Sequence, residues 1–312
     1  MDIIHYPDDP CPARWKQTIL AVGNFDGLHR GHAKIVECVL GRALKFSATA
    51  AVLTFDPHPP RVVRPDKAPA LLMTIDQKLG CLADVGMDGT AIVRFTKEMS
   101  RWEPEAFVYA VLVEWLHVAE VWVGANFLFG HDRRGNFSLL RSLGARYGFR
   151  VEKIDPVRYK EFVVSSTRIR RLVSEGEVDE AGALLGHHYF INGEVVPGSH
   201  RGRPHGFPTA NLKTENEILP LNGVYAATVT IDGIIHPAVT NVGRRPTFET
   251  AGERVVETHL LNYHGDLYGQ HVRVSFIQRI RDERAFDDAV ALKSQIKADC
   301  EDARALFERM SL

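Results

Sequence analysis

The first half of the chain alternates short apolar runs with stretches whose apolar residues recur at helical spacing. The apolar runs occupy residues 19–22, 50–55, 90–95, 120–124 and 149–154. This rhythm is typical of βα units around a parallel sheet. Between the runs, Pro104 is expected at the first position of a buried helix that ends at Leu116. We therefore predict an α/β domain with a Rossmann-like parallel sheet over residues 1–186.

After Gly186 the apolar residues alternate with period two instead. Residues 223–229, 234–242 and 272–277 show this pattern, which predicts antiparallel strands. Asp232-Gly233 lies between two apolar pairs and predicts a type I′ hairpin turn. A final segment, 284–309, has apolar residues at helical spacing. These patterns predict a second domain over residues 187–312, a mainly antiparallel β-barrel with a C-terminal helix.

Composition and charge exclude several classes of protein. The chain has 312 residues, of which 45% are hydrophobic and 25% charged, as in ordinary globular proteins. The formal net charge is -1, whereas a general nucleic-acid-binding protein is expected to be strongly basic. Apolar stretches are too short to cross a bilayer, and the first nine residues lack the apolar region of a secretory signal. We expect a cytoplasmic protein without nucleic-acid or membrane partners. The sequence leaves open whether the chain forms a homo-oligomer.

Four cysteines lie far apart in the sequence. They occupy positions 11, 38, 81 and 300, with no CxxC pair among them. This spacing argues against a disulfide framework and against a cysteine zinc site.

The segment "GNFDGLHRGH", residues 23–32, follows the first apolar run and opens a helical pattern. Glycines there let backbone N–H groups approach a ligand, and a helix N-terminus favours an anion. His29 and His32 at spacing i, i+3 are expected on one helix face, where both imidazoles reach the same phosphate chain. A zinc site is an alternative, although the sequence suggests no third ligand nearby. Structural histidines are the remaining alternative.

His29-Arg30-Gly31-His32 resembles the H-x-G-H signature of the nucleotidyltransferase superfamily. "SSTRIR", residues 165–170, resembles the second phosphate-binding signature of that superfamily. The resemblance implies that the histidines neutralise charge at the α-phosphate of ATP, while hydroxyls and a guanidinium at a second helix start hold the β- and γ-phosphates. A capped surface helix is the alternative for "SSTRIR". The ATP- and phosphate-binding residues implied so far are Gly23, Phe25, Gly31, Ser165, Ser166, Thr167 and Arg168.

The second informative stretch is "GSHRGRPHGFPTANL", residues 198–212. Glycines at intervals of four with arginines between them suggest an anion-binding loop, and neither a Walker A motif nor a G-x-G-x-x-G fingerprint is present. Thr209 and Asn211 offer hard oxygen ligands suited to magnesium. A plain β-turn followed by a polar strand is the alternative.

"GFPTAN" resembles the signature of riboflavin kinases. The likeness continues through "LPLNGVYA", "NVGRRPTF", "VVETHLL", "DLYG", "IRDERAF" and "QIKAD". Nearly the whole chain thus resembles the bacterial bifunctional riboflavin kinase and FAD synthetase family, with an N-terminal FMN adenylyltransferase domain and a C-terminal riboflavin kinase domain.

This resemblance implies roles for individual residues. Thr209 and Asn211 match positions that bind ATP-magnesium, and Glu257 matches the catalytic carboxylate of the kinase. The implied ATP- and flavin-binding residues of the kinase domain are Gly202, Arg203, Gly206, Pro208, Arg281 and Glu283. In the transferase domain, Asn126 matches a nucleotide contact and His58 of "FDPHPP" approaches the site; His29 and His32 are the implied catalytic residues.

The implied function is ATP-dependent phosphorylation of riboflavin to FMN, followed by adenylylation of FMN to FAD with release of pyrophosphate. Mg²⁺ is the implied cofactor, and riboflavin, FMN, FAD and ATP are the implied small-molecule partners. One alternative is that the first domain adenylylates another phosphate compound, as pantetheine-phosphate or nicotinamide-mononucleotide adenylyltransferases do. Another is a flavin-binding sensor that has lost turnover.

Overall fold

The structure, a computed structural model, describes residues 1–15, 17–197, 207–244 and 254–310. Contacts divide the chain into two compact units. The first unit comprises residues 1–70 and 74–165, and the second comprises residues 71–73 and 166–312. Each unit has its own sheet and core.

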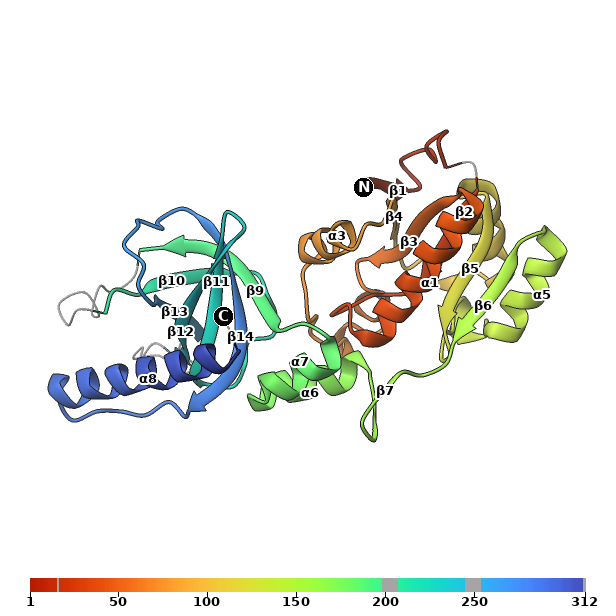
Figure 1. Ribbon diagram of the computed structural model, residues 1–312. Helices are drawn as coiled ribbons and strands as arrows, with labels where there is room; N and C mark the ends of the chain where they lie inside the picture. The colour runs from red at the N-terminus through yellow and green to blue at the C-terminus, as the bar shows by residue number, and fades with distance from the viewer. Residues whose placement is uncertain (16, 198–206, 245–253, 311–312) are drawn as a thin grey trace. The chain divides into compact units, whose positions relative to one another are not determined.

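The first unit contains a six-stranded parallel sheet in the order β1-β4-β3-β2-β5-β6 (Figure 1). Its strands are β1 (Asp2–Tyr6), β2 (Thr18–Val22), β3 (Thr49–Asp56), β4 (Gly89–Arg94), β5 (Val118–Gly124) and β6 (Arg150–Ile154). The five predicted apolar runs all form strands, so the prediction of a Rossmann-like α/β domain is confirmed. Edge strand β1 was not predicted, because it is only five residues long and buries a single side chain, that of Ile4.

Helices connect these strands. They are α1 (Arg30–Phe46), α2 (Pro59–Val63), α3 (Ile75–Asp84), α4 (Pro104–Phe107) and α5 (Phe137–Tyr147), with a π-helical segment over Val108–Trp115. Short 3₁₀ turns lie at Pro65–Lys67, Met99–Arg101 and His131–Arg133, and β7 (Arg158–Tyr159) pairs with β8 (Phe162–Val163). The helix predicted from Pro104 is confirmed, with π-helical geometry in its second part. Helix α1 packs on β2, β3 and β5, so its N-terminus lies beside the carboxyl edge of the sheet.

The second unit contains a closed antiparallel barrel in the order β10-β13-β12-β11-β14-β9. Its strands are β9 (Tyr189–Val196), β10 (Ala210–Thr214), β11 (Gly223–Ile231), β12 (Ile234–Arg244), β13 (Arg254–Leu260) and β14 (His271–Arg281). The predicted hairpin between β11 and β12 is confirmed: Asp232 and Gly233 have φ of 48° and 82°. Helices α6 (Ser166–Glu175) and α7 (Val178–Leu185) precede the barrel, and α7 packs against β9 and β14.

Helix α8 (Ala289–Met310) covers the outside of the barrel (Figure 1). Its buried residues Cys300, Ala303 and Phe307 cluster with Val224 and Val239 of β11 and β12. The helix begins five residues later than the predicted start at 284, because the Asp288 side chain accepts a hydrogen bond from the Ala291 N–H (2.7 Å) in the manner of an N-cap.

All four cysteines are free thiols, as their spacing predicts. Within the part of the chain that the structure describes, no helix is long and apolar enough to cross a membrane. The functional domain boundary at 186/187 stays a prediction, since the compact units divide the chain near Ser165.

Candidate active sites in the two units

The glycine-rich loop at residues 23–29 joins the end of β2 to the start of α1. Phe25, Gly27 and Leu28 have positive φ of 50°, 82° and 38°. Such backbone is strained for Phe25 and Leu28, and strain of this kind clusters at functional sites. Phe25 is fully buried beneath the loop, and its ring lies against Gly23, where an added Cβ would approach to 3.3 Å. The loop is therefore held in a defined shape at the carboxyl edge of the sheet, where α/β folds bind ligands.

His29 caps helix α1 and does not lie within it. Its Nδ1 accepts a hydrogen bond from the His32 backbone N–H (3.3 Å). The two imidazole rings stack with centroids 3.7 Å apart and planes 12° apart. The prediction that both histidines lie on one helix face is therefore wrong for His29, although the cap geometry still brings the rings together.

Gly31 permits this stack. A Cβ built at Gly31 would lie 3.1 Å from Cε1 and 3.2 Å from Nδ1 of His29. A side chain at position 31 would therefore push the His29 ring from its capping position.

Both histidines act as neutral N–H donors in this arrangement. Because His29 Nδ1 accepts a hydrogen bond, its ring proton is on Nε2. Burial lowers the pKa of His32 well below 6.5, and a positive charge on Lys78, or on His29 when protonated, acts in the same direction. The imidazoles can thus hydrogen-bond phosphate oxygens, but the positive charge at this edge has another source.

Lys78 of α3 supplies that charge, and the sequence patterns did not identify it. The side chain is 7% exposed, and its Nζ donates to Thr54 Oγ1 of β3 (3.2 Å). Thr54 in turn donates to the Asn24 carbonyl of the glycine-rich loop (3.2 Å). Burial lowers the pKa of Lys78, while Asp26 and Asp56 raise it. Lys78 is thereby linked directly to the loop that carries the histidines.

His58 and Asn126 follow the ends of other strands in the same sheet. His58 occupies the position before α2, two residues beyond the end of β3, and is 8% exposed. Asn126 is exposed in the turn after β5. Because parallel strands end at one edge, both residues lie on the edge of the sheet that bears the glycine-rich loop.

The "SSTRIR" segment lies at a helix start, as predicted. Ser166 begins α6, and Thr167 is exposed while Ser165 and Arg168 are half-buried. Ser165 ends the first compact unit, and Ser166, Thr167 and Arg168 belong to the second. Their phosphate-binding role stays a prediction.

In the barrel, Asn211 and Glu257 are direct partners across β10 and β13. Glu257 also pairs with Asn241 of β12, so three polar residues form a row across neighbouring strands. Asn211 is 6% exposed, whereas Glu257 is half-buried. The strand register therefore places the predicted metal-binding amide beside the predicted catalytic carboxylate.

The segment before β10 is attached to β13 through His259. The His259 Nδ1–H donates to the Pro208 carbonyl (2.8 Å), and the ring meets Phe207 edge-on. This contact anchors the segment that leads through Thr209 to the Asn211 and Glu257 pair. The Thr209 hydroxyl and the Asn211 amide oxygen fit Mg²⁺, which prefers a few protein oxygens together with water and phosphate. Among the described residues, no group of three or more histidine, cysteine or acidic side chains could hold a metal ion.

Gly202, Arg203 and Gly206 lie outside the described residues. Arg281 and Glu283 are described at the end of β14 and just after it. The Arg281 guanidinium makes a two-pronged ion pair with Asp299 of α8 at 2.8 Å for both contacts. Glu283 accepts a hydrogen bond from the Asn222 side chain (3.0 Å). These contacts fasten the β14–α8 connection, and the predicted contact with flavin stays a prediction.

The fold and the two polar sites define a class of enzyme in which a parallel α/β nucleotide-binding unit precedes an antiparallel barrel. Residues 11–168 match the FAD synthetase family, and residues 185–307 match the riboflavin kinase family. The chain belongs to the bifunctional riboflavin kinase/FMN adenylyltransferase family, which confirms the resemblance found in its sequence.

Curated relatives match nearly the whole chain. A bifunctional riboflavin kinase/FMN adenylyltransferase from Pseudomonas fluorescens is 37% identical over 92% of this chain and 92% of its own length. The protein of that name from Escherichia coli K12 is 38% identical over 93% of this chain and 92% of its own. A crystal structure described as a macrolide-efflux protein from Streptococcus pneumoniae has a TM-score of 0.87 and 29% identity, and it covers 97% of this chain and 99% of its own.

Proposed function

We propose that the protein converts riboflavin to FAD in two ATP-dependent steps. The second unit transfers the γ-phosphoryl group of ATP to riboflavin, giving FMN and ADP. The FMN phosphate then attacks the α-phosphorus of a second ATP, giving FAD and pyrophosphate. One observation supports this proposal above the others: a single chain contains matches to both the FAD synthetase and the riboflavin kinase families.

In the adenylyl transfer, His29 and His32 donate N–H hydrogen bonds to oxygens of the reacting phosphate. The N-terminus of α1 and the Lys78 ammonium add positive potential where negative charge accumulates. The step needs no covalent enzyme intermediate, since positioning and electrostatic stabilisation account for most of such catalysis.

In the phosphoryl transfer, Glu257 accepts the proton of the ribityl 5′-hydroxyl as that oxygen attacks the γ-phosphorus. Thr209 and Asn211 would hold Mg²⁺, which neutralises phosphate charge when bound. The cross-strand pairing of Asn211 with Glu257 supports this assignment, because the general base and the metal must both lie close to the γ-phosphate.

Other roles follow from the family resemblance. Gly23, Phe25 and Gly31 shape the phosphate loop, Ser165 to Arg168 bind phosphates, and Asn126 and His58 contact the nucleotide. Gly202, Arg203, Gly206 and Pro208 bind ATP or flavin, together with Arg281 and Glu283. We also propose a cytoplasmic location, in keeping with the free cysteines. Monomers and homo-oligomers both fit these roles.

A time course of products tests the proposal. The purified protein is incubated with riboflavin, ATP and Mg²⁺, and riboflavin, FMN and FAD are separated by chromatography. FMN is expected to rise before FAD. Folded protein that forms no flavin product would contradict both activities and favour the sensor alternative. FMN without FAD would contradict the second step, and adding phosphopantetheine or nicotinamide mononucleotide then identifies another acceptor.

Variants separate the two steps. His29→Ala with His32→Ala is expected to abolish FAD formation while riboflavin phosphorylation continues. Glu257→Gln is expected to stop phosphorylation of riboflavin while supplied FMN is still adenylylated. Normal FAD formation by the double variant, or normal kinase turnover by Glu257→Gln, would refute the respective assignment.

A further inference from the structure

The barrel has a pair of arginines at one open end. Arg244 and Arg254 are direct partners at the end of β12 and the start of β13. Two residues further into the ladder, Val242 and Val256 are partners in the barrel interior, with exposures of 0% and 1%. Since side chains alternate between the faces of a strand, the two arginines project on the interior side, at the mouth of the barrel.

The predicted kinase residues lie on the other face of the same strands. Asn241 and Glu257 are partners one residue away from the Val242–Val256 pair, and Asn211 extends their row. Alternation therefore directs Asn211, Glu257 and Asn241 to the outer face, which α8 covers nearby through Val239. The barrel wall thus separates the barrel mouth from the row of Asn211, Glu257 and Asn241.

A cavity of about 360 Å³ opens beside the two arginines. This volume is within the range of sites for small molecules. Its described lining consists of Ser174, Leu219, Leu221, Asn222, Arg244 and Arg254. These residues provide two cations, two apolar side chains, a hydroxyl and an amide, and none of them is a carboxylate.

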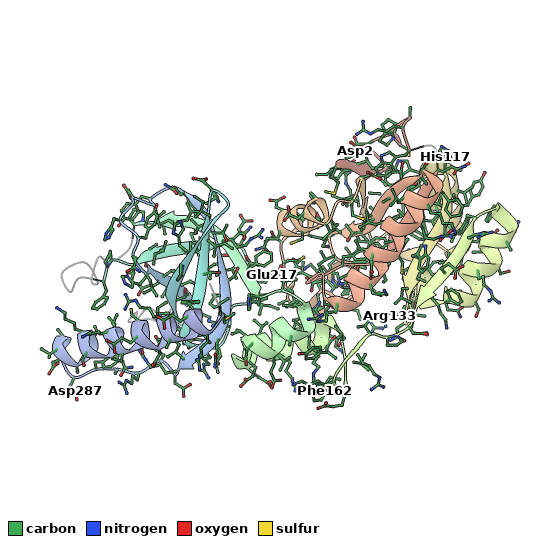
Figure 2. The ribbon with its side chains drawn as sticks, viewed as in Figure 1. Asp2, His117, Arg133, Phe162, Glu217 and Asp287 are labelled. Carbon is green, nitrogen blue, oxygen red and sulfur yellow. The ribbon has the colours of Figure 1, made fainter. Side chains whose placement is uncertain are left out.

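The loop between β10 and β11 contributes much of this lining. The loop has two acidic residues, Glu215 and Glu217, and neither lines the cavity. Glu217, labelled in Figure 2, accepts a hydrogen bond from the Leu71 N–H (2.9 Å). The Arg254 guanidinium donates to the carbonyl oxygens of Leu219 and Pro220, which fixes its orientation. The cavity wall is therefore preorganised around Arg254.

The positive charge of the arginine pair is not neutralised by direct ion pairs. Across the described ranges, neither Arg244 nor Arg254 forms an ion pair with a carboxylate, and the buried Nε of Arg254 has no hydrogen-bond partner. Burial lowers the pKa of Arg254 and the Arg244 charge acts in the same direction, whereas Tyr225 and Glu283 raise it. Two like charges held together in a partly buried wall favour a bound anion, and planar guanidinium groups match phosphate oxygens.

We propose that this barrel-mouth cavity binds the phosphate group of a mononucleotide. Arg244 and Arg254 contact the phosphate, and Leu219 and Leu221 contact the ring system of the ligand. Adenine nucleotides and flavin mononucleotide share this chemistry. The described lining shares no residue with the predicted active sites, although Glu283, a predicted flavin contact held by Asn222 (3.0 Å), borders it. Binding here therefore adds to binding at the Asn211–Glu257 row and at the histidine loop.

Equilibrium dialysis of the full chain against ADP in one arm and FMN in the other tests the proposal. Arg244→Gln is the test variant, because Arg244 is exposed and supports no core packing. Arg304→Gln is the matched control, an exposed arginine on α8 away from the cavity. For at least one ligand, Arg244→Gln should lose one bound molecule per chain or bind it at least tenfold more weakly. Arg304→Gln should bind as the wild type does, and inorganic phosphate should displace the extra molecule.

Unchanged stoichiometry and affinity of Arg244→Gln in both arms would overturn the proposal. A raised KM for riboflavin without loss of a bound molecule would also overturn it, since Arg244 would then act in the kinase site. Crystals of the full chain soaked with the ligand identified by dialysis give a second measurement. Density for phosphate between Arg244 and Arg254 is the expected result, and density confined to other sites would refute the assignment.

Discussion

At the scale of single residues, Lys78 is a buried cation in the first compact unit. A buried ammonium is costly unless its charge is compensated. Lys78 donates to the Thr54 hydroxyl, and burial lowers its pKa although the Asp26 and Asp56 charges act in the opposite direction. We predict that Lys78→Met lowers the rate of FAD formation from FMN by roughly 10²-fold, the effect of removing one preorganised charged donor. Riboflavin phosphorylation should not change. Steady-state assays of both half-reactions measure this.

Lys34→Met is the matched control for Lys78→Met. Lys34 lies on α1 in the same unit, but it is exposed and pairs with Glu37 at 2.8 Å. Its replacement should leave both half-reactions unchanged. Equal losses in the two variants would show that Lys78 has no specific role.

The buried state of His32 predicts a pH dependence of stability. The folded protein keeps His32 neutral because burial lowers its pKa well below 6.5. The unfolded chain protonates it near 6.5, so the unfolded state binds more protons in acid. The contribution of neutral His32 to the free energy of unfolding is fully present above pH 6.5. It is lost as the pH falls below that value. We predict that His32→Gln reduces the loss of unfolding free energy between neutral pH and pH 5, measured by urea denaturation.

An exposed histidine provides the comparison for this pH series. His264 is exposed in the loop after β13, so His264→Gln should follow the wild-type curve. If His32→Gln also follows the wild-type curve, the folded protein does not hold His32 in a depressed state.

Some residues of the candidate transferase site could be predicted from the sequence and others could not. His29 and His32 were predictable because their chemistry follows from a motif of four neighbouring residues. Lys78 was not, because its role depends on how α3 packs near β3. A weak signal existed: Lys78 lies four residues before the buried Leu82, so it lies on the apolar face of the helix. A lysine on the apolar face of a helix is unusual, because buried lysines need a partner for their charge, so its position suggests a functional role.

At the scale of elements, the start of α1 depends on a side chain of minimal size. Because a Cβ at position 31 would lie 3.1 Å from the His29 ring, Gly31→Ala should displace the ring from the cap. We predict a decrease in FAD formation of at least tenfold, since a displacement of about 1 Å can cost 10²-fold. Gly41→Ala in the same helix meets nothing within 4 Å and should raise helix stability by about 0.5–1 kcal/mol without loss of activity. Assays of both variants and their thermal unfolding measure these effects, and an active Gly31→Ala would contradict this account of the cap.

The boundaries of elements were less predictable than their existence. The central strands β2 and β3 are almost wholly buried and apolar, so their runs were recognisable, whereas β1 and β10 are only five residues long with one and two buried residues. Pairing also depends on distant residues: no local pattern shows that Asn211 faces Glu257 across two strands. The resemblance to known families identified these residues, and the register explains why they act together.

At the scale of the whole molecule, the residues proposed for the two reactions are divided between compact units. His29, His32 and Lys78 belong to the first unit, and Asn211 and Glu257 to the second. A substitution in one group should therefore leave the other half-reaction intact. FMN is the product of one reaction and the substrate of the other, so free FMN can connect two different chains.

We therefore predict that two inactive variants complement each other. His29→Ala with His32→Ala should stop at FMN, and Glu257→Gln should not phosphorylate riboflavin. Mixed with riboflavin and ATP, they should produce FAD after a lag that shortens as protein concentration rises, because FMN must diffuse from one chain to another. A chain with all three substitutions, mixed with either variant, is the control and should produce no FAD. If the mixture forms FMN but no FAD, while Glu257→Gln still adenylylates supplied FMN at the concentration reached, the intermediate is retained by the chain that made it.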